Sequence, residues 1–222
     1  MEVEVVLKFL KNLARHNDRE WFEKNKSAYL EAKQEFEEVV SAVLKELSKF
    51  DAGLGGLDPK KLPFRIYRDV RFSKDKRPYK TNMGAGFSPN GRLVQEPGYY
   101  LHIEPGNKSF LAGGIYMPDA NNLARIRQEI DYNPEGLKKI MKGRNFRKFF
   151  EDFDEFDKLK TAPKGYPKEH PDIELLKLKS FIVEMPLTDK QVTDRKFISV
   201  VANGCKAIKP LNDYLREAIA QG

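Results

Sequence analysis

Apolar residues near the N-terminus recur every three or four positions, which is the period of an amphipathic helix. Leu7, Leu10 and Leu13 follow this period and predict a short helix over residues 4–15. Such a helix would bury its leucine face and leave its lysines in solvent.

A longer apolar stripe follows, from Trp21 to Leu47, and predicts a second helix of about eight turns. Asn17 stands where a helix cap is expected, and Glu20 lies three residues on, where its side chain would close a capping box. The glycine-rich stretch 53–56 marks the end of this helix.

The middle of the chain changes to a period of two, which is typical of strands. Apolar residues alternate with polar ones from Phe64 to Phe72, so a regular strand would place Arg68 in the middle of an apolar face. Further strands are predicted over residues 82–88, 99–104 and 109–117, with turns at 89–91 and 105–107. Because short turns join these strands with no helix between them, they should form an antiparallel sheet.

Helical spacing returns after Pro118. Helices are predicted over residues 123–130, 134–141, 172–179, 197–208 and 211–219, and a strand over 181–185. Pro210 should separate the last two helices, because proline removes a helical hydrogen bond. We predict an α+β fold, in which an antiparallel sheet from the middle of the chain packs against N-terminal and C-terminal helices. No repeat or linker divides the sequence, so residues 1–222 are expected to form a single domain.

Composition favours a folded protein of the cytoplasm. Hydrophobic residues make up 40% of the chain and charged residues 33%, which is too apolar for disorder and too charged for a membrane protein. Acidic Glu2 and Glu4 stand where a secretory signal carries basic residues. Cys205 is the only cysteine, so neither a disulfide framework nor a cysteine-rich metal site is expected.

Most of the net charge of +7 falls in one segment, residues 65–82. The segment holds seven lysines and arginines and two aspartates, a balance of +5 that leaves +2 for the rest of the chain. The protein is therefore a nearly neutral body with one basic segment, which favours a local site for an anion over a generally cationic surface.

The residue types in this segment suit the binding of phosphate or carboxylate. Guanidinium groups match the oxygens of both anions two at a time, and lysines add point charge. Asp69 would orient the arginines, or serve as a base or metal ligand. The predicted ligand-binding residues are Arg65, Arg68, Arg71, Lys76, Tyr79, Lys80 and Asn82, and the predicted catalytic residues are Asp69 and His102. The alternative is a salt-bridged strand followed by a solvated basic loop.

The same segment carries a family resemblance. The pattern Arg-x-x-Arg-Asp-x-Arg-Phe-x-x-x-Lys-x-Pro-Tyr-Lys-x-Asn is met by Arg65, Arg68, Asp69, Arg71, Phe72, Lys76, Pro78, Tyr79, Lys80 and Asn82. It resembles the signature of a widespread bacterial family of conserved hypothetical proteins, domain of unknown function 2461. Phe9-Leu10, His16-Asn17-Asp18, Trp21-Phe22 and Tyr100-Leu101-His102-Ile103 are similar to the family as well. The resemblance implies the length and single-domain form of the family, and it implies no activity.

His102 shares a predicted strand face with Tyr100 and Glu104. If that strand lies near residues 65–72, His102 could act as a general acid or base; a partly buried strand histidine is the structural alternative. The three histidines form no pair at metal-ligand spacing, so no metal site is predicted, and the sequence specifies no cofactor.

Three functions compete for the basic segment. We favour a small phosphate- or carboxylate-bearing ligand, bound by a protein that is an enzyme or a binding protein. The second is nucleic-acid binding, with Tyr67, Phe72 and Tyr79 stacking on bases beside the cations. The third is a structural cluster of internal ion pairs with no ligand. The acid in the motif would repel a phosphate backbone, which favours the first; no membrane partner is expected, and the oligomeric state is unspecified.

Overall fold

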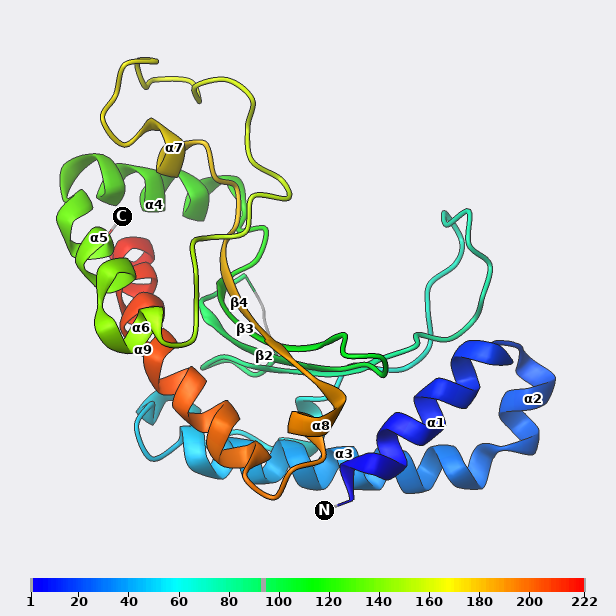
Figure 1. Ribbon diagram of the computed structural model, residues 1–222. Helices are drawn as coiled ribbons and strands as arrows, with labels where there is room; N and C mark the ends of the chain where they lie inside the picture. The colour runs from blue at the N-terminus through cyan, green and yellow to red at the C-terminus, as the bar shows by residue number, and fades with distance from the viewer. Residues whose placement is uncertain (1, 93–94, 222) are drawn as a thin grey trace. The chain divides into compact units, whose positions relative to one another are not determined.

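Helices and a four-stranded sheet make up the structure, a computed structural model that describes residues 2–92 and 95–221 (Figure 1). Its internal contacts divide it into two compact units. The first comprises the residues up to Arg92, together with Tyr100–Leu111 and Pro186–Asn203; the second comprises the other described residues. The α+β class predicted from the hydrophobic pattern is confirmed.

Three helices open the first unit, and the helical period predicted them with one error. They are α1 (Val3–Arg15), α2 (Arg19–Lys24) and α3 (Lys26–Leu47). The expected single second helix is interrupted at Asn25, which ends α2 and begins α3. The expected cap was wrong too: Asp18, not Asn17, accepts a hydrogen bond from the backbone N–H of Trp21 (2.8 Å).

The leucine face of α1 is buried as its spacing requires. Leu10 and Leu13 are fully buried, and α1 packs along α3, whose own stripe buries Phe36, Val39 and Val43. Each such side chain contributes about 2–3 kcal/mol when it is removed from water, so the packing of this helix pair stabilises the first unit.

The sheet has the order β1-β2-β3-β4. The strands are β1 (Met83–Phe87), β2 (Gly98–Ile103), β3 (Ser109–Ile115) and β4 (Phe181–Leu187). All four were predicted to within a few residues. The predicted turn over residues 89–91 is also present, because the backbones of Ser88 and Gly91 bond to each other in both directions.

Strand β2 separates two faces of the sheet. Tyr99, Leu101 and Ile103 are fully buried on one face, and α3 runs along the sheet in the first unit and contacts β1 (Figure 1). Tyr100 and His102 belong to the opposite face because side chains alternate along a strand. Within the first unit this second face carries polar and aromatic groups.

The predicted strand from Phe64 to Phe72 does not form, and the reason is an irregular register. Pro63 pairs with Ala85 and Tyr67 pairs with Tyr79, so three residues on one limb oppose five on the other, 64–66 against 80–84. Such a bulge breaks the alternation of side chains. The exposed fraction of Phe72 is 95%, whereas a regular strand would have buried it.

The remaining elements are short helices and one long one. They are the 3-10 helices η1 (Ala52–Leu54) and η2 (Pro59–Lys61), and the α-helices α4 (Ala120–Tyr132), α5 (Pro134–Lys142), α6 (Arg144–Arg147), α7 (Ile173–Leu176), α8 (Asp189–Val192) and α9 (Phe197–Ala220). The expected break at Pro210 was wrong, since α9 continues through it. Apolar residues on both sides of the proline, Ile208 and Leu211 among them, are fully buried, and their burial offsets the lost hydrogen bond.

Two close approaches in the second unit explain a pair of glycines in β3. A Cβ at Gly114 would lie 1.9 Å from the carbonyl oxygen of Phe181, and one at Gly113 would lie 2.5 Å from Ile208. Only glycine fits at both positions. None of the helices within residues 2–92 and 95–221 combines the length and the low charge that a bilayer-spanning segment requires.

Candidate functional site

The tip of the basic segment, residues 68–78, projects from the sheet as a loop (teal in Figure 1). Arg68 does not lie on an apolar face. Its guanidinium bonds the carboxylate of Asp75 (2.7 Å) and the backbone carbonyl of Arg77 (3.1 Å). Asp75 also accepts from the side chain of Arg77 (2.7 Å), and hydrogen bonds from Arg77 and Arg68 hold the pKa of Asp75 well below its ordinary value.

Asp69 and Arg71 form a second ion pair at the tip and neutralise each other. The carboxylate of Asp69 accepts from both the Nε and the Nη2 of Arg71, the latter at 2.7 Å. These bonds lower the pKa of Asp69, with a smaller contribution from Arg65. Asp69 was expected to orient the arginines in general. It bonds directly to Arg71, whereas the carboxylate that bonds to Arg68 is that of Asp75.

Two other predicted ligand residues have structural partners. The Nζ of Lys76 donates to the backbone carbonyl of Val70 (3.1 Å). The ring of Tyr79 stacks on Phe22 with 4.0 Å between ring centroids, and Tyr79 is only 4% exposed. Tyr79 therefore packs in the core, which the family signature by itself did not indicate.

A small hollow lies at the base of the projecting loop. Its volume is about 180 Å³, and its lining residues are Arg68, Asp75, Arg77, Tyr79, Lys80, Thr81 and Asn82. It is smaller than the roughly 300–1,000 Å³ of a typical drug-sized pocket, so it has room for a group of the size of a phosphate.

Lys80 also belongs to a cluster of cations around the ring of Phe64. Its Nζ lies 5.7 Å from the centroid of that ring, and the Cζ of Arg92 lies 5.5 Å from it. Burial, then repulsion by Arg65 and Arg92, lowers the pKa of Lys80. No carboxylate of the described chain forms an ion pair with Arg65, Lys80 or Arg92, in contrast to the paired arginines at the tip.

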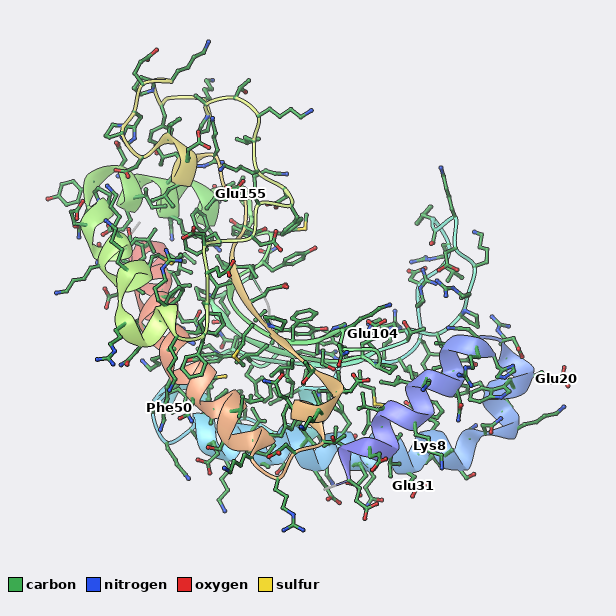
Figure 2. The ribbon with its side chains drawn as sticks, viewed as in Figure 1. Lys8, Glu20, Glu31, Phe50, Glu104 and Glu155 are labelled. Carbon is green, nitrogen blue, oxygen red and sulfur yellow. The ribbon has the colours of Figure 1, made fainter. Side chains whose placement is uncertain are left out.

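Next to this cluster, three side chains of the polar sheet face form a row. The hydroxyl of Tyr100 lies 3.0 Å from Nδ1 of His102, and Nε2 of His102 lies 3.1 Å from Oε2 of Glu104. Phe110 of β3 stacks on the imidazole with 4.5 Å between ring centroids. Figure 2 labels Glu104, and the face lies on the opposite side of the sheet from α3.

The row and the cation cluster are neighbours. The rings of Phe64 and Tyr100 are 6.0 Å apart. Burial lowers the pKa of His102; the bond and the charge of Glu104 act in the opposite direction, and the charge of Lys80 lowers it further. Gly84 makes room for the row, since a Cβ there would lie 2.4 Å from the Tyr100 hydroxyl.

The structure thus brings together some of the predicted site residues and separates others. Lys80 lies close enough to His102 for its charge to lower the pKa of the imidazole, and Arg65 acts in the same way on Lys80. Asp69, Arg71 and Lys76 lie on the projecting loop. Sequence reasoning missed Phe64 and Arg92 as members of the cluster. The row itself was predictable, because Tyr100, His102 and Glu104 are two residues apart and side chains at that spacing share one face of a strand.

Across residues 2–92 and 95–221, no three or more His, Cys, Asp or Glu side chains gather in a way that could hold a metal ion.

Comparison with known proteins gives a single result. The model of a family described as "Conserved hypothetical protein (DUF2461)" matches residues 5–214. No curated protein and no solved structure matches the chain significantly.

Proposed function

The chain belongs to the conserved hypothetical protein family DUF2461, and we propose that it binds a small molecule bearing a phosphate or carboxylate group. The site consists of Lys80 and Arg92 at the ring of Phe64, of Arg65, whose charge acts on Lys80, and of the hollow beside Lys80. The observation that carries the proposal is that Lys80 and Arg92 share the ring of Phe64, and that Lys80 feels the charge of both Arg65 and Arg92, while no carboxylate of the described chain forms an ion pair with any of the three.

Such a cluster is unfavourable until an anion joins it. Like charges repel, and the two arginines disfavour the charged form of Lys80. A bound phosphate or carboxylate would turn this repulsion into attraction. The planar guanidinium groups of Arg65 and Arg92 would bond its oxygens in pairs, and Lys80 would add a point charge.

The lowered pKa of Lys80 supports the same assignment. Burial and the two arginines destabilise its ammonium form, so an anion that restores a favourable environment should bind more tightly than it would to an exposed lysine. Arg68 and Arg71 differ in this respect, because Asp75 and Asp69 already neutralise them.

Of the two residues first proposed as catalytic, His102 has the better position. It lies beside the cation cluster, whose Lys80 affects its pKa, and general acid–base chemistry needs such proximity to the ligand. Asp69 is engaged with Arg71 on the projecting loop. We expect the ligand to be a metabolite of the cytoplasm.

Thermal unfolding in the presence of simple anions tests the proposal. Phosphate, pyrophosphate and citrate should raise the melting temperature relative to sodium chloride of equal ionic strength. A ligand at about 100 times its Kd stabilises the folded state by about 2.7 kcal/mol. The shift should disappear in Arg65→Met and Lys80→Met.

Arg71→Met is the matched control, because it removes the same charge from a residue that Asp69 already neutralises. Its anion-dependent shift should equal that of the unmodified protein. Equal shifts in all variants, or no shift with any anion at millimolar concentration, would rule out this site.

One observation favours nucleic-acid binding as a second candidate. Phe72 is 95% exposed, and the guanidinium of Arg71 lies 5.8 Å from its ring centroid, which is the pairing that stacks and neutralises single-stranded nucleic acid. This candidate predicts binding that weakens steeply with salt and is lost in Phe72→Ala. The small-anion proposal predicts that Phe72→Ala has no effect on phosphate binding.

A further inference from the structure

The row of Tyr100, His102 and Glu104 has a defined direction of hydrogen bonding. An ionised carboxylate only accepts, so Nε2 of His102 must carry the hydrogen that points to Glu104. In a neutral imidazole the other nitrogen, Nδ1, then has a free lone pair. The hydroxyl of Tyr100, 3.0 Å away, donates its hydrogen to that lone pair.

This is the arrangement of a hydroxyl activated by a base that a third group orients. In hydrolytic triads the base is a histidine and the third group a carboxylate; here the hydroxyl belongs to a tyrosine. The three residues alternate along β2 and the turn that follows it, so a single strand supplies the whole row.

The neighbourhood of the cations decides which end of the row meets a ligand. His102 is the buried middle, 9% exposed, with Phe110 stacked on it, while Tyr100 and Glu104 are both partly exposed. The Tyr100 end adjoins Phe64 and hence the cations. The Glu104 end contacts the hydroxyl of Thr81 (3.3 Å).

We propose that Tyr100 is a catalytic residue whose hydroxyl oxygen removes a proton from an O–H group, of the ligand or of water, beside the bound anion. As that proton reaches the tyrosine oxygen, the proton of Tyr100 passes to Nδ1 of His102. The products are an imidazolium, a neutral tyrosine and an oxyanion on the ligand or water, so charge and protons balance. Glu104 is a positioning residue that fixes the tautomer of His102. The inference rests on the proposed anion site, which supplies the ligand.

The environment of His102 fits the role of proton acceptor. Burial lowers its pKa, so the imidazole is neutral near pH 7 and able to accept. Glu104 would stabilise the imidazolium as it forms, and Lys80, with the other cations, would stabilise the oxyanion.

Acetylation by N-acetylimidazole, which modifies tyrosine oxygens, tests the relay with the full-length protein. Mass spectrometry of peptides gives the rate at Tyr100 and at Tyr132, an internal reference that is 87% exposed. If His102 assists as a general base, the ratio of the Tyr100 rate to the Tyr132 rate should fall by about tenfold or more in His102→Asn, and by less in Glu104→Gln. An unchanged ratio in folded variants overturns the relay.

The unmodified protein provides a second measurement that does not depend on the folding of variants. If the relay operates, the acetylation rate of Tyr100 rises as His102 loses its proton; Glu104 and Lys80 also influence that proton. The rate is then constant from about pH 7 to 9, because the imidazole is already neutral there. A rate that instead climbs about tenfold per pH unit towards the ordinary tyrosine pKa of about 10 overturns the proposal.

Inorganic phosphate separates the two proposals. If both hold, phosphate slows acetylation of Tyr100 and raises the melting temperature, and Arg65→Met abolishes both effects. If Tyr100 is reactive and its reaction depends on His102, but phosphate neither slows acetylation nor raises the melting temperature, the relay is supported and the anion site is ruled out. If phosphate raises the melting temperature but the acetylation of Tyr100 does not depend on His102, the anion site is supported and the relay is ruled out.

Discussion

The side-chain amide of Asn17 bonds the backbone of Tyr79 in both directions. Nδ2 of Asn17 donates to the carbonyl of Tyr79 (3.0 Å), and the Tyr79 N–H donates to Oδ1 of Asn17 (3.1 Å). These two bonds join the connection between α1 and α2 to the base of the basic loop, next to Lys80. Asn17 therefore acts as a clamp on the loop and not as the helix cap that its position in the sequence suggested.

We expect Asn17→Ala to lower the free energy of unfolding by about 2 kcal/mol, because two partly buried hydrogen bonds are lost and both Tyr79 backbone groups lose their partner. Urea denaturation measures the change. Gln34→Ala, which removes one long exposed bond of 3.4 Å to Glu38, should change stability by less than about 0.5 kcal/mol. Equal effects of the two substitutions would show that the clamp contributes nothing.

Gly84→Ala should displace Tyr100 and break its bond to His102. The added methyl group would lie 2.4 Å from the Tyr100 oxygen and 2.9 Å from the ring carbon that carries it, and such overpacking costs about 1–3 kcal/mol. Because the closest contact is with the hydroxyl, Gly84→Ala should be better tolerated in a Tyr100→Phe background. A double-mutant cycle by urea denaturation measures this coupling, and strict additivity would contradict the contact.

Two phenylalanines should respond very differently to truncation. Phe22 is fully buried and stacks on Tyr79, so Phe22→Ala should cost about 3–5 kcal/mol. Phe72 is 95% exposed, so Phe72→Ala should stay within about 0.5 kcal/mol of the unmodified protein. A large loss of stability in Phe72→Ala would contradict the exposure of Phe72 and favour the regular strand that the sequence predicted.

The stability of the protein should contain a contribution from His102 that is lost in acid. Its pKa in the folded state is below the ordinary value of 6.5, so between the two values the unfolded chain binds more protons and stability rises with pH. The contribution is complete above about pH 6.5 and declines as the pH falls through the folded-state pKa.

His102→Asn, which does not titrate, provides the comparison for this contribution. The difference in unfolding free energy between the unmodified protein and His102→Asn should shrink as the pH is lowered from about 7.5 to 5. Glu104, Lys80 and Tyr100 face the imidazole, and they stay the same in both proteins. A difference that is constant or grows on acidification would contradict the direction of the pKa shift.

Local patterns predicted most of the elements. The period of two along β2 placed Tyr100, His102 and Glu104 on one face, and the helical period placed the leucines of α1 on one buried face. Both signals depend on neighbours a few residues apart, which is the range over which sequence spacing fixes geometry. The density of charge in residues 65–82 likewise predicted the part of the chain that supplies Arg65 and Lys80.

Tertiary contacts decided the rest. Phe72 lies beyond the bridge between Tyr67 and Tyr79, on the projecting loop, and is exposed. Asp75 rather than Asp69 paired with Arg68, and Arg92 joined Lys80 at the ring of Phe64. Each outcome depends on which strands pair, in which register, and on what lies opposite each side chain. The sequence by itself determined the helical and strand periods and the concentration of charge, because these are local properties; the folded structure decided which charges neutralise one another, because that depends on distances between residues far apart in the chain.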